Sequence, residues 1–153
     1  MNGKTILLLI LVLFPAVFCR SQTSVKNGAA QNASPKPNAP VKTTPAYAEI
    51  LLRRTEREAE LEEFLLDYKE EFPKVKELRF ELSLLQKEID KLFAVNAAES
   101  GKLTLALGKL LVRKIELEID SWNLRRQYND DHPEVKRARR KIEIYERAIK
   151  EIL

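Results

Sequence analysis

Two prolines, Pro73 and Pro133, interrupt a stretch over residues 46–153 that otherwise lacks proline and is rich in Glu, Lys, Arg, Leu and Ile. That composition favours long helices and coiled coils. Proline disfavours the α conformation in the residue before it and suits the first position of a helix. The sequence therefore predicts an all-α fold whose helices break at Phe72 and His132 and restart at the two prolines.

The helical stretch also aligns with itself, without gaps, when it is shifted by 60 residues. The shift pairs a cluster of residues around each proline: Tyr68 with Tyr128, Pro73 with Pro133, Val75 with Val135, Lys76 with Lys136, and Arg79 with Arg139. A fixed period of this kind indicates an internal repeat. We predict two tandem helix–Pro–helix units, residues 46–95 and 102–153, with helices near 46–71, 73–95, 102–128 and 133–153. Two antiparallel hairpins are favoured over two long kinked helices.

The second helix of each unit carries a regular apolar seam. Its members are Val75, Leu78, Leu82, Leu85, Ile89 and Leu92 in one unit, and Val135, Ala138, Ile142, Tyr145, Ile149 and Ile152 in the other. Alternate spacings of three and four residues are the heptad pattern of a coiled coil. The helix that contains Trp122 has a wider apolar face, which predicts burial at the centre of the core or against another subunit. A four-helix bundle and extended hairpins that dimerise both fit this pattern.

The residues before position 46 have a different character. A basic start followed by the apolar run Thr5–Cys19 is typical of a secretory signal peptide, predicted over residues 1–21. An uncleaved membrane anchor and lipidation at Cys19 are the alternatives. Residues 22–45 contain four prolines and few large apolar side chains, so we predict a disordered Pro-rich linker that is a tether or a plain tail. The protein is expected to be exported, periplasmic or secreted, with possible anchoring through its N-terminal segment.

The segment Tyr128-x3-His132-Pro133-x-Val135-Lys136, followed by heptads, resembles a stretch in the periplasmic coiled coils of polysaccharide chain-length-determinant proteins. Those co-polymerases act in exopolysaccharide export, and the stretch lies where two long helices join. The first unit has Phe72 where that pattern has His. The resemblance implies a similar helical hairpin in a bacterial envelope protein.

Residues that could support catalysis are scarce. His132 is the only histidine. A catalytic or metal-binding role would need partners, and the sequence supplies no second histidine and no cysteine after the predicted signal peptide. The equivalent position is Phe72, so a packing or turn role fits both units. No Gly-rich phosphate loop is present. We therefore predict no enzyme activity, no bound metal and no cofactor.

The most suggestive polar feature is a basic run formed by Lys136, Arg137, Arg139, Arg140 and Lys141. Our leading hypothesis is a non-enzymatic coiled-coil structural or interaction protein of the bacterial cell envelope. Its heptad seams would bind a protein partner or a second copy. The alternative is a periplasmic binding or chaperone-like module whose basic run grips an anionic polysaccharide, a membrane surface or a client protein. Nucleic acid is not an expected partner. The sequence leaves partner and oligomeric state open.

Overall fold

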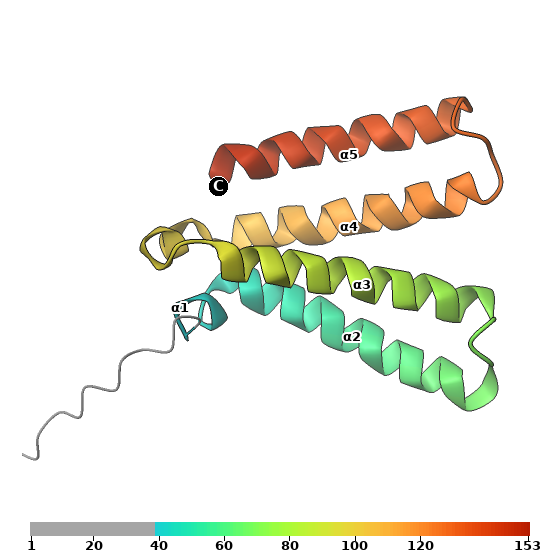
Figure 1. The fold of residues 1–153 in the computed structure, drawn as a ribbon, viewed down its shortest axis with the longest axis horizontal. Coiled ribbons are helices and arrows are strands. Elements are labelled where there is room, and N and C mark those ends of the chain that lie inside the picture. Colours follow the sequence, from blue (N-terminus) through green and yellow to red (C-terminus); the bar gives the residue numbers. More distant parts are fainter. Residues whose placement is uncertain (1–38) are drawn as a thin grey trace, which may run out of the picture. The chain divides into compact units, whose positions relative to one another are not determined.

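A computed structural model describes residues 39–153, which form helices and no strand (Figure 1). The elements are α1 Ala39–Lys42, α2 Pro45–Asp67, α3 Pro73–Ala94, the 3-10 helix η1 Ala97–Lys102, α4 Leu105–Arg125 and α5 Pro133–Ile152. The predicted all-α class is confirmed. The predicted signal peptide and residues 22–38 of the predicted linker lie outside the described residues.

The last residues of the predicted linker differ from the expectation. Ala39–Lys42 forms the short helix α1, which contacts η1 and the start of α2. Val41 is 2% exposed and belongs to the core, and Thr44 is also buried. The prolines at positions 40 and 45 suggested an unstructured chain. In the structure Pro45 occupies the first turn of α2, directly after the cap residue Thr44.

The long helices begin at positions that are 60 residues apart. Thr44 precedes α2 and Thr104 precedes α4, and the hydroxyl of each accepts a hydrogen bond from the backbone N–H three residues on. Those bonds satisfy one of the N–H groups that a helix start leaves without a partner. Pro73 and Pro133 occupy the first turns of α3 and α5.

Each turn before a proline contains a stacked pair of rings. The Tyr68 and Phe72 centroids lie 4.1 Å apart, and those of Tyr128 and His132 lie 4.0 Å apart. An arginine from the following helix also reaches back to each turn. Arg79 Nε donates to Glu70 at 2.6 Å, and Arg139 contacts Asp130 at 3.5 Å. The repeated sequence cluster thus supplies the side chains that hold the two turns.

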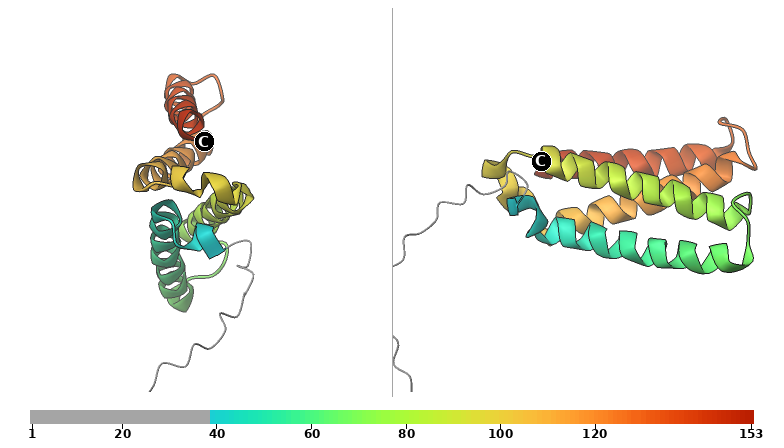
Figure 2. Two further views of the ribbon diagram at one scale, coloured as in Figure 1. Left: turned by 90° about the vertical axis from the view of Figure 1, so that its left-hand side faces the viewer. Right: turned by 60° about the horizontal axis from the view of Figure 1, so that its bottom comes forward.

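Helix α4 lies at the centre of the described helices. It contacts α2, α3 and α5, whereas α5 packs mainly against α4 (Figures 1 and 2). The core along α4 is built from Leu107, Leu111 and Ile115, with Ile50 from α2 and Leu85 from α3. A second cluster of Leu61, Val75 and Leu78 lies toward the α2–α3 turn. The helices therefore do not close into a four-helix bundle.

Helices α2 and α4 approach each other closely at Gly108. A Cβ atom at this position would lie 2.9 Å from the Ala46 Cα and 2.9 Å from the Glu49 Cβ. Ala46 N also donates to the carbonyl of Leu103 at 3.2 Å. Glycine is therefore required here by the closeness of a neighbouring backbone.

Candidate functional site

Helices α3 and α5 enclose a groove that has α4 as its floor. Because α5 packs mainly on α4, it does not cover the neighbouring face of α3. Two pockets of about 230 and 460 Å³ lie along this groove and share Glu146. We refer to it as the α3–α4–α5 groove.

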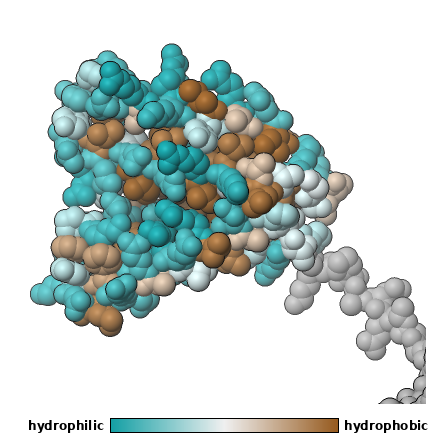
Figure 3. Space-filling view, turned by 180° about the vertical axis from the view of Figure 1, so that it is seen from behind, coloured by the Kyte–Doolittle hydropathy of each residue, from teal (hydrophilic) through white to brown (hydrophobic). Residues whose placement is uncertain are grey.

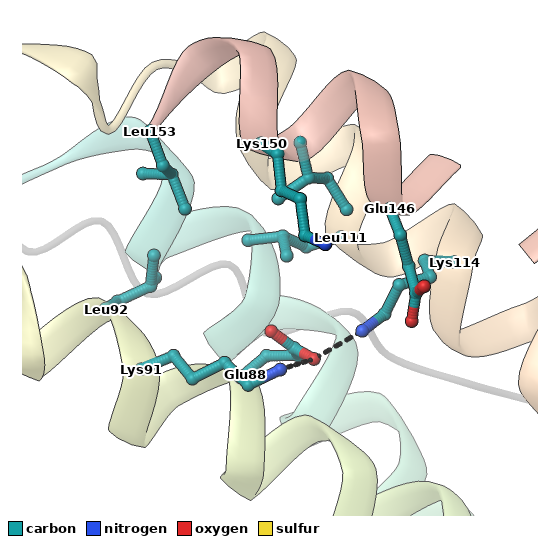
Figure 4. A pocket seen from close by; sticks show the side chains of 9 residues that line it. Glu88, Lys91, Leu92, Leu111, Lys114, Glu146, Lys150 and Leu153 are labelled. Carbon is teal, nitrogen blue, oxygen red and sulfur yellow. Dashed lines mark hydrogen bonds and ion pairs between the residues drawn. The ribbon is translucent and has the colours of Figure 1, made fainter. Parts of the chain in front are cut away.

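One end of the groove surrounds a buried ion pair (Figure 4). Lys114 Nζ lies 2.6 Å from Glu88 Oε1, and the two side chains are 7% and 5% exposed. Lys91 donates to the same carboxylate at 2.8 Å from a half-exposed position. Glu146 and Lys150 reach toward this pocket from α5 (Figure 4). The cluster joins α3 to α4 and forms the polar wall of the smaller pocket.

Both members of the buried pair are held in their charged forms. Burial alone would raise the pKa of Glu88, but the hydrogen bonds and the positive charges of Lys114 and Lys91 together outweigh burial and lower the pKa. Burial alone would lower the pKa of Lys114, but its hydrogen bond to Glu88 and the charges of Glu88 and Glu118 raise it. An ammonium group with a raised pKa is a poor nucleophile and a poor general base near neutral pH. The pair therefore suits a structural role.

The other end of the groove is aromatic. Phe80 of α3 stacks on Trp122 of α4 with ring centroids 5.3 Å apart, and the Arg126 guanidinium lies 4.9 Å from the Trp122 ring. Leu84 and Ile142 line the same pocket and are only partly buried. A partly exposed apolar strip flanked by charged side chains is a typical surface for binding the apolar face of a helix.

The basic run lies on the exposed side of α5, apart from Ala138, which points inward. Four of its five charged side chains have acidic partners: Lys136 with Asp131, Arg137 with Glu134, Arg139 with Asp130, and Arg140 with Glu143. Lys141 lines a separate pocket between α4 and α5. The charge of the run is thus largely balanced by its own surroundings.

The repeat-motif residues lie at the turns and at the start of the following helix. Val75 and Val135 are fully buried, whereas Tyr68 and Tyr128 remain partly exposed. His132 Nδ1 accepts a hydrogen bond from the Glu134 backbone at 3.3 Å, which makes it the cap of α5. Across residues 39–153, no group of three or more His, Cys, Asp or Glu side chains is arranged to hold a metal ion. No helix in this range has the length and apolar character needed to cross a membrane.

Sequence reasoning missed the Glu88–Lys114 pair. A signal was present, because Lys114 lies three residues after Leu111 within an apolar face, and Glu88 directly precedes the seam residue Ile89. Neither residue stands out in a sequence in which 33% of the residues are charged. Only the packing of α3 on α4 brings these two residues, 26 positions apart, into contact.

Comparison with known proteins gave no relative. The chain matches no family model, and no curated protein or solved structure is significantly similar to it. The function must therefore be argued from this chain's own residues.

Proposed function

We propose that this protein is an exported, non-enzymatic helical interaction protein of the bacterial cell envelope, and that its α3–α4–α5 groove binds an amphipathic helix of a partner protein. The observation that carries the proposal is the open groove itself. Phe80, Leu84, Trp122 and Ile142 leave apolar surface only partly covered along three converging helices. A helix laid in this groove would bury that surface.

The repeat supports a scaffold built from two copies of one helical hairpin. Helices start 60 residues apart, the capping threonines correspond, and the stacked rings and arginine contacts correspond at both turns. The seam residues Val75, Leu78, Leu85, Ile89 and Leu92 are covered by other helices of the same chain. The partner surface that we propose is therefore the groove and not this first seam; the second seam contributes Ile142 to the groove.

A site-specific photocrosslinker tests the groove. A photoreactive phenylalanine derivative replaces Leu84, which lines the groove, or the neighbouring Ser83, which is exposed on another side of α3. In the native host, position 84 should give one discrete crosslinked species and position 83 should not. Equal crosslinking at both positions, or none at position 84, would contradict the proposal. Trp122 is the only tryptophan, so binding should also shift its fluorescence.

The alternative function, in which the basic run grips an anionic polymer, has weaker support. Four of its five cations already have acidic partners, and exposed pairs of this kind leave little net field. If this function holds, reversing Arg137, Arg139 and Arg140 to Glu should abolish binding to a sulfated polysaccharide while helicity stays unchanged. Binding that survives the reversal would exclude it.

The envelope location rests on the predicted signal peptide and on the resemblance to chain-length-determinant coiled coils. The intact mass of the protein from soluble and membrane fractions of its host tests this directly. A mass that begins near Gln22 would support export with cleavage. A full-length or lipid-modified mass in the membrane fraction would support an anchored protein. An unprocessed, unmodified chain recovered from the cytosol would contradict export.

A further inference from the structure

The way in which α4 docks on α2 and α3 defines a specific contact pattern. Arg53 of α2 lies 3.7 Å from Glu116 of α4. On α3, Glu77 accepts a hydrogen bond from Asn123 at 2.8 Å. A third contact is the Phe80–Trp122 ring stack, and a fourth is the close approach of Ala46 to Gly108. In each of the four contacts, a residue on one edge of the α2–α3 pair meets a residue on the same face of α4.

Each residue on the edge of α2 and α3 has a counterpart 60 positions later, on the edge formed by α4 and α5. No helix of residues 39–153 covers this α4–α5 edge. The counterpart of Arg53 is Arg113, that of Glu77 is Arg137, and that of Phe80 is Arg140. The side chains of these three arginines are 54%, 71% and 78% exposed, and each forms an ion pair within its own helix, with Glu116, Glu134 and Glu143 respectively. Exposed pairs of this kind contribute little energy, so each arginine can also bind a glutamate of another copy. Ile144, the counterpart of the groove residue Leu84, is 49% exposed. Seen from behind, the described helices show hydrophobic side chains between hydrophilic ones on their surface (Figure 3).

The face of α4 that contacts α2 and α3 has its own counterpart 60 positions earlier in the chain. That counterpart is the outer face of α2. The counterparts of Glu116, Trp122 and Asn123 are Glu56, Glu62 and Glu63. All three of these α2 glutamates are exposed. Val112, which packs against the core, becomes Leu52, which is 58% exposed. The chain thus presents an uncovered edge at one end of its helix stack and an uncovered docking face at the other.

These two surfaces are complementary in charge and in register. Repeating the observed docking between two copies would set Glu56 opposite Arg113, Glu63 opposite Arg137 and Glu62 opposite Arg140. The Arg53–Glu116 ion pair would recur as Arg113–Glu56, and the other two contacts, Glu77–Asn123 and Phe80–Trp122, would each be replaced by a pair of opposite charges. Random charge placement on two helical surfaces would not favour three opposite pairs at three corresponding positions.

We propose that a second copy of this chain docks its α2 on the α4–α5 edge, and so continues the helix stack head to tail. Small residues are also present where the two helices would approach most closely. Within the chain Ala46 faces Gly108; between two copies, their counterparts Ala106 and Ala48 would face each other. Ala48 has the Cβ that Gly108 lacks, so the two helices would lie slightly farther apart than α2 and α4 do. The interface is heterologous, so it propagates into a ring or a filament. It uses none of the groove contacts and does not depend on the proposed function.

A charge-swap experiment tests this docking on the protein purified as its host processes it. The acidic face is reversed in the variant E56K/E62K/E63K, and the basic edge in R113E/R137E/R140E. Mass is measured by sedimentation across a concentration series at low salt, and helicity by circular dichroism. The wild-type protein should reach at least twice the mass of one chain, with a lower mass at high salt because exposed charges are screened. Each variant alone should stay at the mass of one chain.

An equimolar mixture of the two variants is the decisive sample, because each reversed surface then meets its opposite. The mixture should regain the higher mass, which a merely unfolded variant could not do. The control E151K, which reverses one exposed charge outside both surfaces, should behave as the wild type does. A wild-type protein that stays at the mass of one chain at every concentration would overturn the proposal. Variants that keep the wild-type mass, or a mixture that stays at the single-chain mass, would do the same.

Discussion

The buried ion pair of Glu88 and Lys114 provides the sharpest test of how the helices are held together. Replacing Lys114 by Met would leave the Glu88 carboxylate 5% exposed, with only Lys91 as a partner. Removing one member of a buried pair costs about 3–5 kcal/mol, because the other charge stays buried without compensation. Lys91 still donates at 2.8 Å, which places the expected loss near the lower end, at about 3 kcal/mol.

Two further variants separate the ion pair from general disturbance. Lys91→Met removes a 52% exposed partner while Lys114 remains, so we expect a loss below about 1 kcal/mol. The double variant with Lys114→Met and Glu88→Leu replaces both charges by apolar side chains. Such replacements are often neutral, so its stability should return to within about 1 kcal/mol of the wild type.

The assay is urea denaturation followed by far-UV circular dichroism, with the free energy of unfolding compared at an unchanged dependence on urea concentration. Equal losses for Lys114→Met and Lys91→Met would show that burial of the pair has no energetic consequence. A double variant no more stable than Lys114→Met would refute the reasoning that an unpaired buried charge causes the loss.

Three other predictions follow from the same structure. Gly108→Val should lower the free energy of unfolding by about 2–3 kcal/mol in urea denaturation, because the valine side chain would meet the Ala46 backbone. The control Gly101→Ala, whose Cβ would have nothing within 4 Å, should change this free energy by less than about 0.5 kcal/mol. Thr104→Ala removes the cap of α4 and should cost about 1 kcal/mol, measured as a lower midpoint of thermal unfolding. The pKa of Glu88 is lowered in the folded protein, so ionised Glu88 stabilises the fold at pH values above the unfolded carboxyl pKa of about 4.3. This contribution to the free energy of unfolding is lost as the pH falls through the lower pKa of the folded state. Glu88→Gln should therefore unfold with a weaker dependence on pH below about pH 4 than the wild type; an unchanged acid limb would contradict this.

The sequence contained enough local information to place most of the helices. The positions of Pro73 and Pro133 determine where α3 and α5 begin, since proline restricts both its own backbone and that of the residue before it. Apolar periodicity also identified inward positions, such as Val75, Leu78 and Val135, which are fully buried. The wide apolar face around Trp122 predicted burial at the centre of the core or against another subunit, and α4 contacts three neighbouring helices of the chain.

Local information could not find the candidate groove or the docking edge. Lys114 and Glu88 look like solvated charges in the sequence, and only the packing of α4 on α3 buries them together. Ala39–Lys42 read as part of a linker because its composition is proline-rich, yet contact with η1 and α2 buries Val41. In each case the deciding contact joins residues far apart in the chain.

The sequence by itself therefore determined the helical class, the starts of α3 and α5, and many of the positions that point inward. Those properties depend on backbone restrictions and side-chain spacing within a few residues. The tertiary structure alone decided that α5 packs mainly on α4, that a groove remains beside α3, and which charges are buried. These depend on how apolar faces from distant segments fit together, and many pairings of the same faces satisfy the sequence pattern equally well.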